Sequence, residues 1–258
     1  MPREKDKFLF NKKDLSLYER NFDANGKETK PTKLSEGFYP KNLHRDIDTD
    51  ETSMGLKTIF HGKRILRYVT LDKLQPSKLA DLAKYGYPFI DAYNRRLISR
   101  FLDSQVKTLP MVEVTKGLGW KELEGKQFFQ LQDSISVNND VNVKYVGDIL
   151  VKSAGTYEEY VDILNKHVFP YIQTQVMVAF STSSALASYI DPELNFILHM
   201  NSQTTSGKTT MLGLSSSVWG SPERRNNGIH QTWNATHNAV LNSLCGVNSG
   251  KKMHENPV

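Results

Sequence analysis

The sequence is poor in cysteine and lacks a long apolar run. Cys245 is its only cysteine, so no disulfide can form within the chain, and a reducing compartment is expected. The most apolar window, residues 176–190, is interrupted by Ser181, Thr182 and several further serines, which excludes a membrane span. No apolar stretch of the signal-peptide kind follows the charged residues 1–7. These absences predict a cytoplasmic protein without membrane contact.

Charge is abundant, and basic residues are in slight excess. The chain has 258 residues with 33 Lys and Arg against 28 Asp and Glu, a net charge of +5, and 38% hydrophobic residues. This composition is typical of a globular protein large enough to bury a core. Basic clusters at 5–13, 95–96 and 224–225 have acidic neighbours or lie in polar stretches. Solvated surface charge is the favoured interpretation of these clusters, and a DNA partner stays open.

Three stretches differ in character. Residues 1–50 are polar and lysine-rich with weak periodicity, which predicts a loosely ordered segment. Residues 51–150 predict an α+β module. In it we expect a hairpin of strands 55–60 and 63–70, helices at 76–85 and 91–104, and short strands at 111–115, 126–131 and 141–145.

Residues 151–258 change to a helical pattern. Thr156 and Glu159 have the spacing of a capping box and predict a helix that runs towards Pro170. A longer helix is expected from Ile172 to Ile190, with small residues that allow close packing. An apolar run at 195–200 predicts a strand. Residues 209–218 predict a further helix, whose buried stripe consists of Met211, Leu214 and Val218.

Between this last strand and helix lies a candidate phosphate-binding loop. Residues 202–209 match the pattern GxxxxGK[ST] except at the first position, where Ser202 replaces glycine. Backbone amides of such a loop form an anion nest at the positive end of the following helix. The residues predicted to hold a nucleotide are Ser202, Thr204, Thr205, Ser206, Gly207, Lys208, Thr209 and Thr210.

The residue types of this loop suit ATP with Mg²⁺. Gly207 permits close backbone approach, Lys208 reaches the β- and γ-phosphates, and the Thr209 hydroxyl helps to hold Mg²⁺. A positive φ at Ser202 would cost on the order of 1–3 kcal/mol. The alternative is a chance Gly-Lys-Thr in an ordinary loop, but the position between a strand and a helix favours the phosphate loop.

The rest of the C-terminal stretch carries less chemistry. Trp233 is a core residue, an interface residue or a stacking platform for a base, and the first two are favoured. His199, His230, His237 and His254 lack the usual spacing of metal ligands. No catalytic nucleophile, base or acid can be identified.

Five pieces of sequence in this order resemble the domain-of-unknown-function family 927 of mobile elements and prophages. They are Gly117–Trp120, the small-residue helix, the loop 204–210, Ser217–Gly220 and Thr232–Thr236. Members of that family are similar to AAA+-type replicative helicases, including self-loading helicases of staphylococcal cassette elements. The resemblance implies a DNA-dependent ATPase that works as a ring, with ATP, Mg²⁺, DNA and further subunits as partners.

Two departures from the family pattern bear on activity. The family has glycine where Ser202 stands, and it continues to an apolar strand that ends in Asp-Glu, which orients Mg²⁺ and water. Here the only Asp-Glu pair is Asp50-Glu51, far upstream of the loop. We therefore expect a truncated member of α/β class, an N-terminal α+β module followed by a partial P-loop NTPase domain, that does not hydrolyse ATP efficiently alone.

Two other functions remain open at this point. One is a non-catalytic binding or regulatory remnant that associates with full-length subunits or DNA. The other is a small-molecule kinase, which ranks last because no acceptor site is visible.

Overall fold

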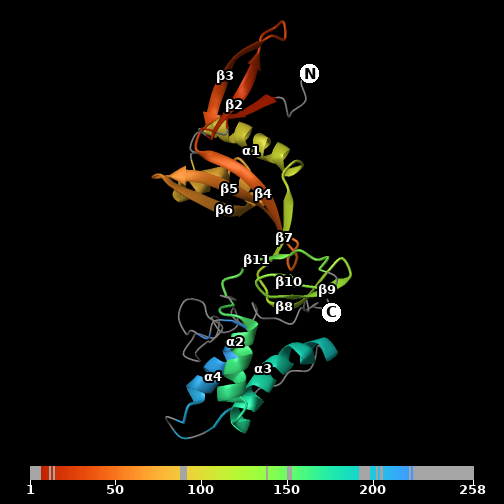
Figure 1. Cartoon of the computed structure of the whole chain (residues 1–258). Helices are drawn as coiled ribbons and strands as arrows, with labels where there is room; N and C mark the ends of the chain where they lie inside the picture. Colours follow the sequence, from red (N-terminus) through yellow and green to blue (C-terminus); the bar gives the residue numbers. More distant parts are fainter. Residues whose placement is uncertain are drawn as a thin grey trace, which may run out of the picture. The chain divides into compact units, whose positions relative to one another are not determined.

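The computed structural model describes residues 7–11, 13, 15–87, 92–137, 139–149, 153–191, 198–201, 203, 206–220 and 222, without the side chains of Ala92 and Ser188 (Figure 1). Two units make up the chain, Met1–Glu113 and Val114–Val258. Each contains both strands and helices, so the fold is of mixed α/β type.

The first unit begins with antiparallel strands. β1 (Phe8–Asn11), β2 (Ser16–Phe22) and β3 (Glu28–Ser35) form a sheet in that order. β4 (Phe38–Asp46), β5 (Thr52–Phe60) and β6 (Lys63–Thr70) follow as an antiparallel meander, and β7 (Met111–Thr115) lies beside β4. The predicted hairpin of β5 and β6 is confirmed, with His61 and Gly62 at positive φ in its turn.

The expectation of a loosely ordered stretch at 1–50 is wrong for the described part of it, because β1 to β4 lie there. Their polar residues hide the strand pattern, and register shifts interrupt the period of two in β2–β3 and β4–β5. A few buried side chains hold the strands instead, namely Leu17, Leu34, Phe38 and Leu43.

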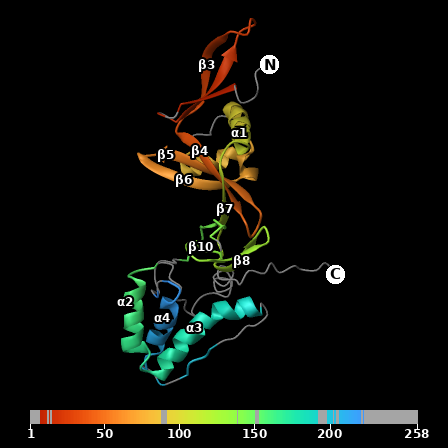
Figure 2. The same cartoon turned by 45° about the vertical axis from the view of Figure 1, so that its right-hand side comes forward.

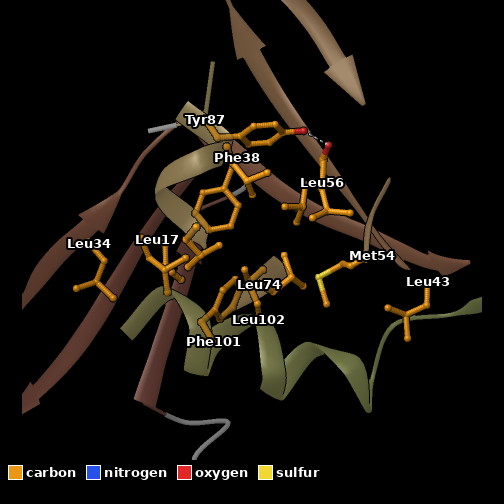
Figure 3. Packing of buried hydrophobic residues seen from close by; sticks show 14 residues of the cluster. Leu17, Leu34, Phe38, Leu43, Met54, Leu56, Leu74, Tyr87, Phe101 and Leu102 are labelled. Atoms are coloured by element: carbon orange, nitrogen blue, oxygen red, sulfur yellow. Dashed lines mark hydrogen bonds between the residues drawn. The ribbon is translucent and has the colours of Figure 1, made fainter. Parts of the chain in front are cut away.

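Helical segments cover one face of the β4–β5–β6 sheet. They are the 3₁₀ helices η2 (Leu71–Leu74) and η3 (Leu79–Tyr85) and the helix α1 (Ala92–Val106). Figure 3 shows Phe101 and Leu102 of α1 packed near Met54 and Leu56 of β5 in the core of this unit. The predicted helix at 76–85 is therefore a 3₁₀ helix, and Gly86 ends it at φ +86° as expected from its position.

The second unit has short strands. β8 (Gly119–Leu123), β9 (Lys126–Gln130) and β10 (Ser134–Ile135) form an antiparallel sheet, and β11 (Lys144–Tyr145) pairs in parallel with the last residues of β7. The strand predicted at 126–131 is confirmed as β9. The strand at 141–145 shortens to β11, and β8 was not predicted.

The helices of this unit gather in one group (Figure 2). They are α2 (Tyr157–Ile163), which continues as the π-helical turn η4 (Leu164–Val168), α3 (Ile172–Ile190) and α4 (Lys208–Ser217). The capping box is confirmed, because Thr156 Oγ1 accepts from Glu159 N and the Glu159 carboxylate accepts from Thr156 N. No helix among the described residues is long and apolar enough to cross a membrane.

One predicted strand is not confirmed. Of residues 195–200, those at 195–197 lie outside the described residues, and those at 198–200 do not belong to a strand.

Tyr87 offers a test of the first unit's core. Its hydroxyl donates to the Leu56 carbonyl at 2.7 Å, and burial raises the pKa of its phenol. We expect Tyr87→Phe to lower the free energy of unfolding by about 1–2 kcal/mol, because the buried carbonyl loses its donor. Denaturant unfolding measures the change. The partly exposed Tyr85 provides the control Tyr85→Phe, which should stay within about 0.5 kcal/mol of the parent. Equal stability of the two variants would contradict the role of the hydrogen bond.

Candidate nucleotide-binding site

A glycine in the left-handed region begins α4. Gly207 caps the helix in the left-handed region, at φ +86° and ψ 9°, and its carbonyl accepts the first helical hydrogen bond from Met211 N at 3.0 Å. A Cβ built at Gly207 meets no atom within 4 Å, so its conformation, not space, demands glycine here. The turn directs the first amides of α4 out of the helix end.

Lys208 and Thr209 occupy the first turn of α4. The Lys208 Nζ donates to the Gln203 carbonyl at 2.7 Å, so the ammonium folds back over the loop that precedes its own helix. Thr209 and Thr210 are exposed, as is Ser206. The predicted contact residues Ser202, Thr204 and Thr205 lie outside the described residues. The structure thus describes five of the eight predicted residues, those from Ser206 to Thr210. The Lys208 ammonium lies next to the preceding loop, at the Gln203 carbonyl.

The electrostatics of this helix end favour an anion. The first turn of α4 carries no acidic side chain, and no side chain of the described residues caps it. The aligned peptide dipoles leave partial positive charge at this end, to which the Lys208 ammonium adds a full charge. A phosphate group suits such a site.

α4 is held on α3 by hydrogen bonds and an apolar contact. Ser181 Oγ donates to the Ser215 carbonyl at 2.7 Å. The indole N–H of Trp219, just after α4, donates to the Ser181 carbonyl at 3.1 Å. Leu214 and Val218 pack against a cluster from α3 and η4, which agrees with two of the three residues of the predicted stripe; Met211 is not in this cluster. The two helices meet at Ser181, which makes two polar contacts with α4 and the residue after it.

A second tryptophan binds the same helix. Trp120 of β8 donates its indole N–H to the Ala185 carbonyl at 2.8 Å, one helical turn from the Ser181 carbonyl. Phe129 of β9 lies between the two indoles, with ring centroids 5.2 Å from Trp120 and 5.8 Å from Trp219. We call Trp120, Phe129 and Trp219 the tryptophan clamp. The sequence singled out both tryptophan segments, but nothing in it indicated that they meet on α3.

Most of the other candidate residues lie outside the described part of the chain. The segment around Trp233 and the histidines His230, His237 and His254 lie outside the described residues, and His199 is exposed. In the described part of the chain, no three His, Cys, Asp or Glu side chains gather as a metal-binding group.

Comparison with known proteins points to one family and one fold. The family model described as "Domain of unknown function (DUF927)" matches residues 10–250. A solved structure of an active helicase, Cch of SCCmec type IV, superposes with a TM-score of 0.69 at 21% identity. The match covers 93% of this chain and 46% of that one, so the chain spans less than half the length of the helicase. No curated protein matches the chain.

The tryptophan clamp makes a testable contribution to the stability of α4. We expect Trp219→Phe, which keeps an aromatic ring beside Phe129 but lacks the indole N–H, to weaken the attachment of α4 by about 1 kcal/mol. Hydrogen exchange of the α4 amides should then accelerate about fivefold. Ser217→Ala, which removes only a hydroxyl bonded to the Leu214 carbonyl of its own helix, is the control. Unchanged exchange in Trp219→Phe would show that the indole hydrogen bond does not hold α4.

Proposed function

The chain belongs to the DUF927 family, and we propose that it is an ATP-binding, helicase-like P-loop protein that serves DNA replication of a mobile genetic element. One observation carries this proposal: Gly207 turns the chain into α4 so that Lys208 and Thr209 lie at a helix start free of acidic side chains. The same residues complete the sequence pattern of a phosphate loop.

Each residue of the loop has a role in holding ATP. The backbone amides from Thr204 to Lys208 bind phosphate oxygens, with Ser202 at the entry of the loop. Lys208 exchanges the Gln203 carbonyl for a phosphate oxygen, a stronger acceptor because it is charged. The Thr209 hydroxyl ligates Mg²⁺, which neutralises charge on the phosphates when it is bound.

Binding and hydrolysis have different requirements. Hydrolysis needs an acidic side chain near the phosphates to orient Mg²⁺ and the attacking water. After the loop, the sequence contains only Glu223 and Glu255 as acidic residues, and neither follows an apolar strand pattern. We therefore expect this chain to bind ATP without efficient turnover of its own.

The family and the fold support the proposed wider role. The similar solved protein is named as an active helicase, and likeness at 21% identity supports a shared fold. For this chain, DNA and further subunits of a ring are proposed partners. A purely regulatory binding role is the alternative, and it would use the same loop.

Lys208→Ala tests the phosphate loop. We expect the affinity for labelled ATP·Mg²⁺ to fall roughly 10- to 100-fold, because the lysine supplies charge-assisted hydrogen bonds to phosphate. Equilibrium binding to the whole chain measures this, while phosphate release is followed in parallel and should stay near background.

Lys166→Ala, which removes an exposed lysine from η4, is the matched control and should bind as the parent does. Equal affinity of Lys208→Ala and the parent would refute the nucleotide site. Brisk phosphate release by the parent would instead refute the expectation of binding without turnover.

Thr209→Val tests the metal. In the parent, we expect Mg²⁺ to raise ATP affinity relative to binding in EDTA, and the variant should lose most of this gain because it lacks the ligating hydroxyl. In EDTA the two proteins should bind alike. Thr182→Val, whose hydroxyl bonds only carbonyls of its own helix α3, is the control. A full Mg²⁺ effect in Thr209→Val would remove this threonine from the metal site.

A further inference from the structure

The β4–β5–β6 sheet of the first unit has a second face with a distinct chemistry. Strand register places Gly55, Lys57 and Ile59 of β5 on one side together with Tyr68, Leu66 and Arg64 of β6. We call this side the outer face. The described helical segments η2, η3 and α1 contribute their buried residues to the opposite side, with Met54, Leu56 and Val69.

Tyr68 lies flat across the outer face. Its ring stacks on His44 of β4 with centroids 3.5 Å apart and planes at 16°. Its hydroxyl donates to Asn42 Oδ1 at 3.1 Å. It passes over Gly55, where a Cβ would come within 2.9 Å of the ring, so glycine allows the close approach. Three contacts therefore fix the ring, while 38% of the residue stays exposed.

A fixed and exposed ring is well suited to stacking. Because its orientation is set before a ligand arrives, little side-chain entropy is lost on binding. One face of the ring rests on His44 and the sheet, which leaves the other for a flat partner. Ile59 and Leu66 extend this surface as exposed apolar side chains along the hairpin.

The hairpin that carries the ring has charged residues of one sign. The hairpin from Thr52 to Thr70 contains Lys57, Lys63, Arg64 and Arg67 and no acidic residue. Lys57 and Arg64 share the outer face with Tyr68, since register pairs them with Leu66 and Ile59. Acidic residues lie at the end of the hairpin opposite its turn: Asp50 and Glu113 pair with Arg45, and Asp72 accepts a hydrogen bond from Thr70. The outer face thus combines an aromatic platform with cations that lack acidic neighbours in the hairpin.

We propose that the outer face binds single-stranded nucleic acid, with a base stacked on Tyr68 and phosphates paired with Lys57 and Arg64. Flat rings beside basic side chains on an open sheet suit unpaired bases, whose π-faces are accessible, whereas paired bases are stacked on one another. The surface lies in the first unit and does not depend on the nucleotide site of α4.

Binding of a fluorescein-labelled oligothymidylate to the whole chain, followed by anisotropy without ATP, tests the proposal. Tyr68→Ala should weaken binding roughly 5- to 150-fold, the effect of losing one stacked base. Tyr68→Phe keeps the ring and should bind nearly as the parent does. Tyr93→Ala removes an aromatic of α1 that is 72% exposed and should leave affinity unchanged.

Salt dependence separates the cations from the ring. Each of Lys57→Ala and Arg64→Ala should reduce the slope of log affinity against log salt by about 0.7, because one fewer counterion is released from a single strand. The single variants Lys73→Ala and Lys107→Ala are the controls. Each removes one positive charge from an exposed position, in η2 and after α1 respectively, and should keep the parental slope of log affinity against log salt. These surface substitutions remain decisive if Tyr68→Ala does not fold.

Three results would overturn the proposal. One is unchanged affinity in Tyr68→Ala together with the parental slope in the Lys57→Ala, Arg64→Ala pair. Another is tighter binding of duplex than of single strand. The third is a parent dimer that Tyr68→Ala dissociates without any effect on the oligonucleotide, which would make the face an interface between copies. ATP binding measured on the same variants should match the parent, so failure here is distinct from failure of the nucleotide site.

Discussion

The attachment of α4 to α3 is the interaction on which the candidate nucleotide site depends. A phosphate loop works only if the helix behind it keeps its amides aimed at one place. Here the Ser181 side chain and backbone carbonyl bond to the last turn of α4, at Ser215, and to Trp219 just after the helix. An indole fits this task because it donates one hydrogen bond while its ring fills apolar space.

Small residues and aromatic residues have complementary parts in this arrangement. Ser181 of α3 contacts the backbone of α4, and the tryptophan clamp then joins the helix pair to the β8–β9 hairpin through Phe129. The first unit uses the same principle on its outer face, where Gly55 leaves room for the ring of Tyr68. In both units a small residue lies directly beside an aromatic side chain: Ser181 beside Trp219, and Gly55 beside Tyr68.

The errors of sequence interpretation have physical causes. Strands β1 to β4 were missed because polar side chains and register shifts hide a period of two, and burial of a few leucines decides their structure. The expected helix at 76–85 forms a 3₁₀ helix, since periodicity over so short a segment does not separate the two kinds. The elements with local signals were predicted well, among them the capping box at Thr156 and the hairpin turn at His61-Gly62.

By itself, the sequence predicted a glycine before the last described helix, a helix expected from Thr209 and observed from Lys208, and the family resemblance. These features depend on residues close together in the chain, where backbone sterics and hydrogen bonding act locally. Only the tertiary structure decided that Trp120 and Trp219 meet on α3, and that Tyr68 crosses β5 to reach His44. Such contacts join residues far apart in sequence, and their geometry depends on register and packing that no local pattern encodes.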